Sequence, residues 1–338
     1  MNIRSIAKES GLSVATVSRV LNNESGVSDE ARQKALKVIE RSGYKPRNYS
    51  QRRGTRIAIV VEAGAPSFDS FYSLVFTGIS RYAWECGFEA TLVYYSPDHE
   101  RNSGGELVDL LRKKRCNGAV LIAPISESEG QNLIDARIPS VLVAHRLSLD
   151  GIGYIDCNNF QGASDLTEYL LHLGHRKIGY LCGNLENGNN SDRLNGYLKA
   201  MESVGVEVDD GWMIEHHPTD VTEQAGYDQA LFLLERYPDI TAIFANNDSM
   251  AYGAVTACME TGLRVPEDIS VVGYDDYLSS RYYNPSLTTM RQPLMEMGAS
   301  AARWVDEKLK NKISDLPHRV FRGELIVRKS CALPRADS

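Results

Sequence analysis

The chain has 338 residues, 43% of them hydrophobic and 24% charged, which is the composition of a globular protein long enough for two or three domains. Its N-terminus carries Arg4, Lys8 and Glu9 where a secretory signal is apolar, and no apolar run is long enough to span a membrane. The six cysteines are scattered without a Cys-x-x-Cys pair, which is typical of reduced thiols. We therefore expect a cytoplasmic protein with no membrane partner.

Two short amphipathic helical patterns lie within residues 2–21 and are separated by Gly11-Leu12-Ser13. Asn2 and Ser13 are well placed to cap them, since each side-chain oxygen can accept from the free amides of a first helical turn. Two helices joined by a turn of three or four residues with a glycine are typical of the helix-turn-helix arrangement, whose second helix enters the major groove of DNA. An ordinary helical hairpin has the same spacing and is the alternative.

The distribution of charge favours DNA binding. Residues 1–56 contain 12 Lys and Arg and 5 Asp and Glu, a net charge of +7, whereas the other 282 residues carry a net charge of −14. A basic unit on an acidic body suits phosphate contact at one end only. A third helix is expected from about Ser28 to Ser42, and Pro46 then stops helix formation. We expect a headpiece over residues 1–45 and a polar, basic linker over residues 46–56.

From Ile57 onward, short apolar runs alternate with helix-length periodic segments. This alternation predicts parallel sheets with helices on both faces, and the units are too many for one sheet, so we expect two lobes. The strand candidates are Ile57–Val61, Thr91–Tyr95, Ala119–Ala123, Val141–Ala144, Ile178–Leu181, Ala242–Ala245 and Ile269–Val272. The helix candidates include Leu74–Cys86, Ala163–Leu173, Gly196–Val204 and Met250–Thr261.

Six segments in a fixed order carry a resemblance to a known family. The first runs from Ile6 to Asn22 and reads IAKESGLSVATVSRVLN. The others are Leu173–Leu181, Arg193–Tyr197, Ala245–Gly253, Val265–Asp276 and Pro285–Pro293. Together they resemble the lactose/galactose repressor family of bacterial transcriptional regulators, over nearly the whole chain.

This resemblance implies a small all-α helix-turn-helix headpiece followed by an α/β core similar to the periplasmic binding proteins. Such a core has two lobes with parallel sheets, three crossover hinge strands, and a ligand between the lobes. In this chain the core would cover residues 57–338. The N-lobe would comprise about 57–157 and 288–318, and the C-lobe about 158–287 and 319–332.

The resemblance assigns base reading to Val14, Ala15 and Arg19 of the second helix. A guanidinium can bind guanine O6 and N7 together, which is worth about 1–3 kcal/mol of discrimination, and apolar side chains can contact a thymine methyl. A phosphate contact is the alternative for Arg19. Phosphate contacts set the register without reading sequence, and they are expected around the start of this helix. The candidates for them are Thr16, Ser18 and the backbone amides at the helix start, and Ser13 and Asn22 are further DNA-binding candidates.

The linker departs from the family pattern. Family members usually have Ala-Arg-x-Leu here, and the Leu of this hinge helix wedges into the minor groove. Residues 48–54 contain no Leu, and the stretch is roughly four residues shorter than usual. Wedges are normally apolar, so Tyr49 is one possible substitute. Arg52 and Arg53 in a narrow minor groove are the other.

Effector contacts are assigned by resemblance to loops that follow the core strands, where such folds bind ligands. The candidates are Asp69, Phe71, Tyr72, His145, Arg146, Asn189, Arg193, Val221, Asn247 and Asp275. Arg193 is a planar donor fork, and Asp69 and Asp275 are acceptors, a combination that suits vicinal hydroxyls. Phe71 and Tyr72 can lie against the apolar face of a sugar ring. The structural alternative is an Arg193–Asp275 pair across the cleft, with the aromatic side chains in the core.

A small sugar is the expected effector, because the candidate residues form no obvious phosphate-binding cluster. Val221 stands where many relatives carry an aromatic wall that suits a purine, and His145 replaces an Asp that is common in relatives. The alternative is a purine-responsive or phosphoprotein-responsive repressor of the same family. A solute-binding receptor of transport type is a more distant alternative, since the basic headpiece argues against it.

We expect binding rather than catalysis. Gly151-Ile-Gly153 lacks the third glycine of a dinucleotide loop, and His172 and His175 have no recognisable partners for a metal ion. No enzyme activity, cofactor or metal is therefore expected. The expected partners are a double-stranded DNA operator, a small effector and a second copy of the chain.

Two recognition helices of a homodimer would read a near-palindrome, with the effector shifting the population between two arrangements of the lobes. The C-terminal tail has no apolar heptads, so a dimer rather than a tetramer is expected.

Overall fold

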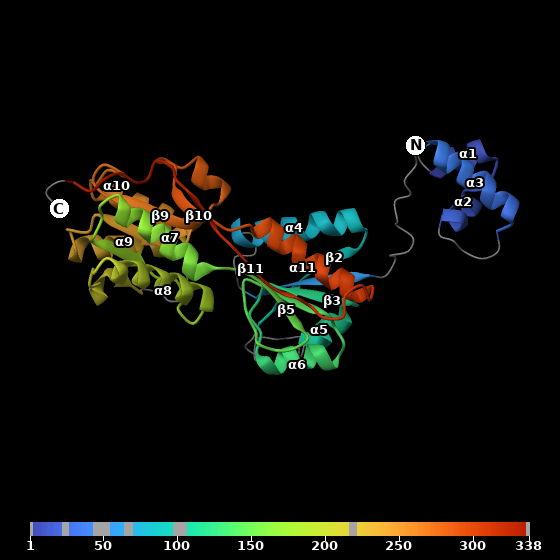
Figure 1. Cartoon of the computed structure of the whole chain (residues 1–338), viewed down its shortest axis with the longest axis horizontal. Helices are drawn as coiled ribbons and strands as arrows, with labels where there is room; N and C mark the ends of the chain where they lie inside the picture. Colours follow the sequence, from blue (N-terminus) through green and yellow to red (C-terminus); the bar gives the residue numbers. More distant parts are fainter. Residues whose placement is uncertain are drawn as a thin grey trace.

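The computed structural model describes residues 3–21, 27–42, 55–63, 70–96, 107–215 and 222–335. Its first three helices are α1 (Ile3–Ser10), α2 (Val14–Leu21) and α3 (Asp29–Ser42), and they pack together as a small unit (Figure 1). Ser28 Oγ accepts a hydrogen bond from the backbone N of Ala31 at 3.3 Å, which confirms the predicted start of the third helix. The core of the unit consists of Ile6, Ala7, Val17 and Val38.

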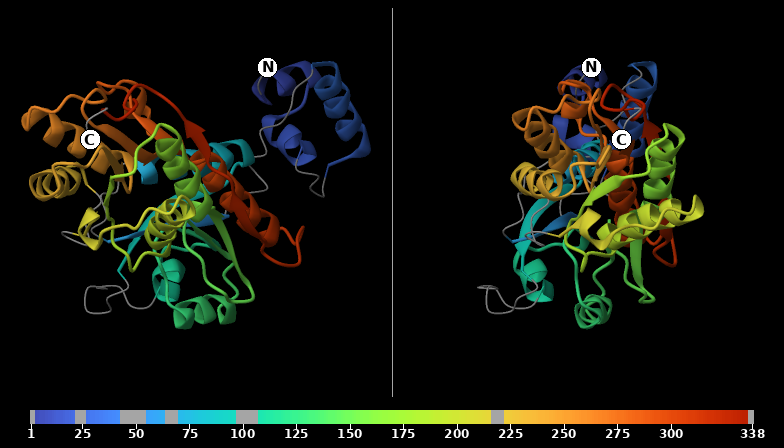
Figure 2. Two further views of the ribbon diagram at one scale, coloured as in Figure 1. Left: turned by 60° about the vertical axis from the view of Figure 1, so that its left-hand side comes forward. Right: turned by 90° about the vertical axis from the view of Figure 1, so that its left-hand side faces the viewer.

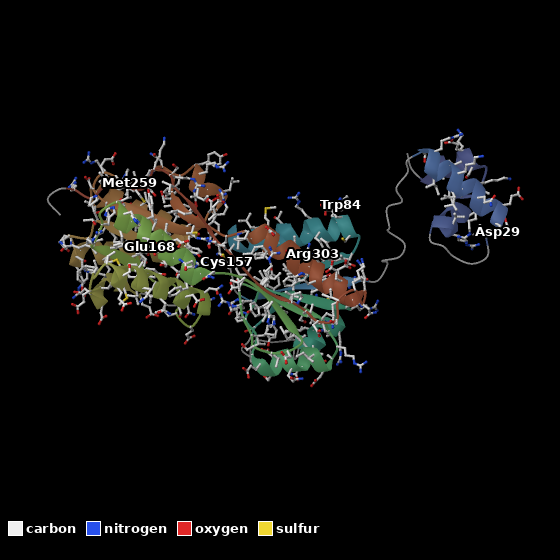
Figure 3. The ribbon with its side chains drawn as sticks, viewed as in Figure 1. Asp29, Trp84, Cys157, Glu168, Met259 and Arg303 are labelled. Carbon is white, nitrogen blue, oxygen red and sulfur yellow. The ribbon has the colours of Figure 1, made fainter. Side chains whose placement is uncertain are left out.

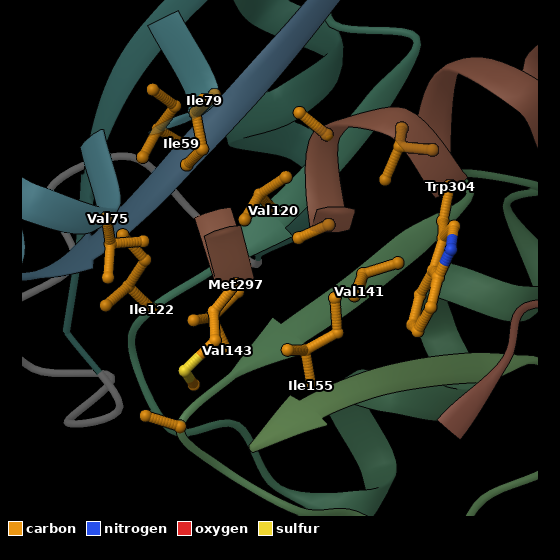
Figure 4. Close-up of a cluster of buried hydrophobic side chains, with 14 of the residues drawn as sticks. Ile59, Val75, Ile79, Val120, Ile122, Val141, Val143, Ile155, Met297 and Trp304 are labelled. Carbon is orange, nitrogen blue, oxygen red and sulfur yellow. The ribbon is translucent and has the colours of Figure 1, made fainter. Parts of the chain in front are cut away.

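The first lobe is built on a six-stranded sheet in which every pair of neighbouring strands is parallel. In spatial order its strands are β11 (His318–Phe321), β5 (Ile152–Cys157), β4 (Ser140–Val143), β3 (Gly118–Leu121), β1 (Arg56–Glu62) and β2 (Glu89–Tyr95). Helices α4 (Ser70–Cys86) and α11 (Leu294–Leu309) cover one face, and α5 (Leu107–Lys113) and α6 (Glu127–Asp135) cover the other. Figure 4 shows Met297 and Trp304 of α11 close to the sheet residues Val141, Val143 and Ile155.

The second lobe repeats this plan with a second six-stranded sheet, in which only the β10–β12 pair is antiparallel. Its strands in spatial order are β12 (Glu324–Ile326), β10 (Thr288–Arg291), β9 (Ser270–Asp275), β8 (Ala242–Ala245), β6 (Ile178–Leu181) and β7 (Met213–Ile214). Helices α7 (Asn159–His172) and α8 (Gly188–Ser203) cover one face, and α9 (Glu223–Arg236) and α10 (Asp248–Glu260) cover the other. Two short 3-10 helices, η2 (Asp210–Trp212) and η3 (Leu278–Arg281), lie in its connections.

Glycines let the covering helices of the first lobe approach closely. A Cβ atom on Gly78 of α4 would lie 1.9 Å from the backbone oxygen of Met295 in α11, and one on Gly298 of α11 would lie 2.2 Å from that of Val75. Any larger residue would therefore separate the two helices. This close contact fixes how α11, which comes late in the sequence, closes the first lobe.

Within the described residues, the chain passes from one lobe to the other three times (Figures 1 and 2). The passages lie between β5 and α7, between β10 and α11, and between β11 and β12. The first agrees with the expected lobe boundary after residue 157. The other two lie three to four residues later than expected, because β10 pairs with β9 of the second lobe and all of β11 pairs with β5 of the first.

The apolar runs predicted two strands without error, β6 and β8, and they located β1, β2, β3, β4 and β9 to within one to three residues. The prediction did not include β5, β7, β10, β11 and β12. β7 has only two residues, and β11 exposes three of its four side chains at a sheet edge, so neither forms an apolar run. No described helix combines the length and the hydropathy that a membrane span requires.

Candidate functional site

The second headpiece helix exposes its first turn to solvent. Ser13 Oγ caps α2 by accepting from the backbone N of Thr16 at 3.1 Å, and it also lies 2.9 Å from Thr16 Oγ1. Val17 and Val20 are buried, whereas Val14, Ala15 and Arg19 are exposed. The three residues expected to read bases are therefore accessible to a DNA groove. The side chain of Ser18 and all of Asn22, Tyr49, Arg52 and Arg53 lie outside the described residues.

A pocket of about 590 Å³ lies between the two lobes and is called the interlobe pocket below. The first lobe contributes the ends of β1 and β4, the start of α4 and the segment after β3, and the second lobe contributes the β6–α8 connection and the start of α8. Both sheets thus turn the carboxyl ends of their parallel strands towards it, as ligand sites of such folds do. Its lining residues are Glu62, Tyr72, Pro124, Ile125, Leu142, Ala144, His145, Arg146, Asn184, Glu186, Asn187, Gly188, Asn189 and Asp192.

Four of the ten effector candidates line this pocket: Tyr72, His145, Arg146 and Asn189. Asp69 and Val221 lie outside the described residues. The remaining four, Phe71, Arg193, Asn247 and Asp275, are described but do not line the pocket. Phe71 packs against Tyr72 and the first-lobe core, as the structural alternative expected for the aromatic residues.

His145 is a neutral hydrogen-bonding group of the pocket wall. Its Nε2 lies 3.1 Å from the carbonyl oxygen of Ile122, which can only accept, so Nε2 carries the proton and donates. Burial lowers the pKa of His145 to about 4. The imidazole is therefore uncharged at neutral pH, and Nδ1 keeps a lone pair that can accept from a hydroxyl group.

Arg146 is held by carboxylates from both lobes. Its Nε donates to Asp156 Oδ2 at 2.5 Å, and its Nη2 lies 3.6 Å from Asp192 Oδ2. Asp156 lies next to the last residue of β5 in the first lobe and is fully buried, whereas Asp192 belongs to α8 of the second lobe. The guanidinium therefore already has two carboxylate partners in this structure.

Asn189 also connects the lobes. Its side-chain amide donates to the carbonyl oxygen of Ala144 at 2.8 Å and to Asp156 Oδ1 at 3.2 Å, both in the first lobe. Its backbone N donates to Asn187 Oδ1 at 2.9 Å, which is the N-cap bond of α8. The cap fixes the start of α8 at the mouth of the pocket, and the amide then reaches across.

Arg193 and Asp275 form a buried pair inside the second lobe. Arg193 Nη2 lies 3.3 Å from Asp275 Oδ1, and both side chains are buried. Gln292 donates to the same carboxylate oxygen at 2.6 Å. Asn247 caps α10 by accepting from the backbone N of Met250 at 2.8 Å. Arg193 and Asp275 thus form the pair that the structural alternative expected, but the pair lies inside the second lobe and not across the cleft. An effector contact from them stays a prediction.

Several lining residues were absent from the sequence prediction, among them Glu62, Glu186 and Asp192. Glu62 ends β1, and Glu186 lies in the connection that follows β6, so both occupy the carboxyl end of a strand. That position was the available signal for them. Asp192 had no such signal, because it lies in the second turn of a helix whose start was predicted eight residues too late.

The interlobe pocket is equipped for binding. It offers amide, imidazole and carboxylate groups that can exchange hydrogen bonds with a polar molecule. No group of three or more His, Cys, Asp or Glu side chains with metal-binding geometry occurs among the described residues.

Comparison with known proteins connects both parts of the chain to one family. Residues 2–47 match the model of the bacterial regulatory proteins of the lacI family, and residues 167–331 match that of the periplasmic binding protein-like domain. The HTH-type transcriptional regulator DegA of Bacillus subtilis is 30% identical over 337 residues, which cover 97% of each chain. The HTH-type transcriptional repressor PurR of Haemophilus influenzae is 30% identical over 340 residues, covering 97% of this chain and 98% of its own.

Among solved structures, the transcriptional regulator CelR in complex with cellobiose superposes with a TM-score of 0.73. It is 29% identical, and the match covers 98% of this chain and 99% of CelR. These relatives are transcriptional regulators, and their likeness extends over the headpiece and both lobes.

Proposed function

Because this chain belongs to the lacI family of bacterial regulatory proteins, and is thus a DNA-binding transcriptional regulator, we propose that it is a repressor controlled by a small neutral sugar. It acts in the cytoplasm as a homodimer on a palindromic operator, and it works by binding rather than by catalysis. The headpiece of residues 1–45 reads the operator, and the linker of residues 46–56 transmits the state of the core. The observation that carries the proposal is the polar interlobe pocket, to which both lobes contribute.

The lining of the interlobe pocket favours an uncharged ligand over a phosphorylated one. Among the described lining residues, Glu62, Glu186 and Asp192 are acidic, and Arg146 is the one side chain with a full positive charge. That charge is already matched by Asp156 and Asp192. A phosphate would therefore meet net negative charge without a free cation, whereas sugar hydroxyls can donate to these carboxylates.

A purine is less well supported by the same walls. Planar bases are commonly bound between aromatic side chains, and Tyr72 and the smaller imidazole of His145 are the aromatic groups among the described lining residues. The solved relative CelR holds cellobiose, a neutral sugar. By analogy with that complex, a mono- or disaccharide is the best-supported effector.

Exposed apolar side chains on both lobes support a dimer. Trp84 of α4 is 72% exposed and Phe76 of the same helix is exposed, and the second lobe exposes Met259, Leu278 and Tyr282. Trp84 and Met259 both lie along the upper edge of the core in Figure 3. Apolar surface on both lobes is suited to a second copy of the chain, and two recognition helices are what a palindromic operator requires.

Effector control follows as a shift between two arrangements of the lobes. A sugar that contacts both walls of the interlobe pocket favours the arrangement in which those walls are close. This changes the spacing of the headpieces that the two first lobes carry, and hence their fit to the operator.

Two experiments test this proposal. In a thermal-shift screen, a neutral mono- or disaccharide should raise the melting temperature. The matching sugar phosphates and purines should leave it unchanged. A purine or sugar phosphate as the sole ligand would contradict the sugar assignment. In sedimentation, Trp84→Glu should yield monomers, whereas Val204→Glu, at an exposed apolar residue of the second lobe, should remain a dimer. A Trp84→Glu variant that remains dimeric would show that Trp84 does not lie in the dimer interface.

A further inference from the structure

Three polar contacts join the two walls of the interlobe pocket, and groups of the protein alone make them. Asn189 of the second lobe binds the Ala144 carbonyl at 2.8 Å and Asp156 Oδ1 at 3.2 Å in the first lobe. Arg146 of the first lobe lies 3.6 Å from Asp192 of the second. All three contacts involve a side chain that binds the buried carboxylate of Asp156, because Asn189 donates to it at 3.2 Å and Arg146 at 2.5 Å.

We propose that Asp192 is a positioning residue which, together with Asn189, latches the two lobes through Arg146 and Asp156 before any effector binds. Asp156 is the fixed end of the latch, since it is fully buried and its Oδ1 also accepts from the backbone N of Cys157 at 2.7 Å. Asp192 and Asn189 are the movable end, since both lie in the first two turns of α8. The existence of the latch is independent of the proposed function, but its role in effector control rests on it.

The latch is weak enough to act as a switch. The Arg146 and Asp192 side chains are 41% and 35% exposed, so water and salt screen their attraction. The hydrogen bond from Asn189 to the Ala144 carbonyl is neutral and contributes little net free energy, and its bond to the Asp156 carboxylate is longer, at 3.2 Å. Each contact should change the equilibrium between joined and separated lobes by about fivefold. Burial raises the pKa of Asp192 more than Arg146 lowers it, which agrees with an ion pair of limited strength.

The latch also explains which groups an effector meets. Arg146 and Asn189 line the interlobe pocket, yet their donors are directed at Asp156, Asp192 and Ala144. A ligand that binds these donors must replace contacts between the lobes with contacts to itself. Effector binding and lobe arrangement are then coupled through the same atoms.

The test measures the distance between the lobes in the full chain without effector. Donor and acceptor dyes are attached through non-natural amino acids at two exposed positions, Glu127 of the first lobe and Ser203 of the second. Labelled protein is mixed with excess unlabelled protein so that transfer within one protomer dominates. Wild type should show high transfer at low salt, and transfer should fall as the salt concentration is raised from about 0.05 to 0.5 M, the range over which charges become screened.

The variants distinguish a latch from a merely structural role. Asp192→Asn should lower the transfer and remove its salt dependence, and Asn189→Ala in the same chain should lower it further. Asp192→Glu, which keeps the charge, should retain salt-dependent transfer. Asp239→Asn breaks an exposed ion pair with Lys177 inside the second lobe and should match wild type.

Unchanged transfer and unchanged salt dependence in the Asp192→Asn, Asn189→Ala double variant would overturn the proposed latch. That result would leave the proposed function standing, because the sugar screen and DNA binding are measured separately. Conversely, the latch can be present in a chain that binds no sugar.

Discussion

Arg193 and Asp275 form an ion pair that is buried within the second lobe and connected to two of the passages between the lobes. Arg193 donates from Nε to Asn159 Oδ1 at 2.8 Å and from Nη1 to the Asn246 carbonyl at 2.7 Å. Its guanidinium also stacks 3.9 Å from the ring centre of Tyr274. Asn159 begins the helix after the first passage, and Gln292, which binds Asp275, begins the second. The pair therefore holds both passages to the second lobe.

Arg193→Ala should destabilise the protein by about 3–5 kcal/mol, because the variant leaves the Asp275 carboxylate buried without its cation. Urea unfolding followed by tryptophan fluorescence measures this free energy. Lys199→Ala, which breaks an exposed pair with Glu202 on the same helix, is the control and should leave the unfolding curve unchanged. Equal unfolding midpoints for the two variants would contradict the structural role of the pair.

Asp248 should make stability depend on pH. Its carboxylate is fully buried and accepts from the hydroxyls of Ser280 and Thr289, yet burial and the nearby Asp275 raise its pKa to about 8. The folded state then binds a proton more tightly than the unfolded chain, so this contribution to stability is greatest below about pH 4 and is lost as pH rises through 8.

Asp248→Asn should therefore flatten the decline in unfolding free energy between about pH 5 and 8, by roughly 1.4 kcal/mol per pH unit at most. The measurement is the difference between wild type and variant in urea unfolding at each pH, which cancels the other titrating groups. A difference that stays constant across this range would show that Asp248 does not titrate there.

Arg19→Ala should reduce discrimination between the operator and altered sequences. An exposed guanidinium on α2 can contact a guanine edge, and its loss should weaken binding to the operator by about 1–3 kcal/mol. Fluorescence anisotropy with operator and single-base variants measures this. Lys37→Ala on the exposed side of α3 removes the same charge and should leave discrimination intact. If Arg19→Ala weakens binding to all sequences equally, Arg19 is a phosphate contact.

The linker arginines should contribute to the salt dependence of DNA binding. Arg52→Ala with Arg53→Ala removes two positive charges, which should lower the slope of log affinity against log salt by about 1.8 if both contact phosphates. The control is the double variant Arg112→Ala with Lys113→Ala, which removes two exposed charges from α5 of the core. An unchanged slope in the linker variant would rule out the electrostatic role of the linker.

Apolar runs predicted the central strands well, because β6 and β8 are buried on both faces and carry four consecutive buried residues each. β10 was not predicted because two of its buried residues, Thr288 and Thr289, are polar and so form no apolar run. Their burial is possible because their polar groups have hydrogen-bond partners. Thr289 donates to Asp248, and the backbone N of Thr288 donates to Ser330. Such partners are far away in sequence, so no local pattern reveals them.

The residues of the candidate site were likewise predicted in part. Loops after parallel strands predicted the position of the pocket, and His145 and Asn189 line it as expected. Asp192 and Arg193 are adjacent on α8, so their side chains point about 100° apart, and one lines the pocket while the other enters the lobe. Which of two neighbours faces a pocket depends on the rotation of the helix, which the sequence does not specify here.

Sequence-specific, sugar-controlled DNA binding is tested most directly by selecting binding sites from random DNA with the full-length protein and measuring anisotropy on the selected site. The selected site should have twofold symmetry, and the protein should bind it at least about a thousandfold more tightly than a scrambled duplex at the same salt concentration. The sugar found in the thermal-shift screen should change this affinity and leave binding to the scrambled duplex unaltered. Equal affinity for both duplexes, with no effect of the sugar, would contradict the proposed function.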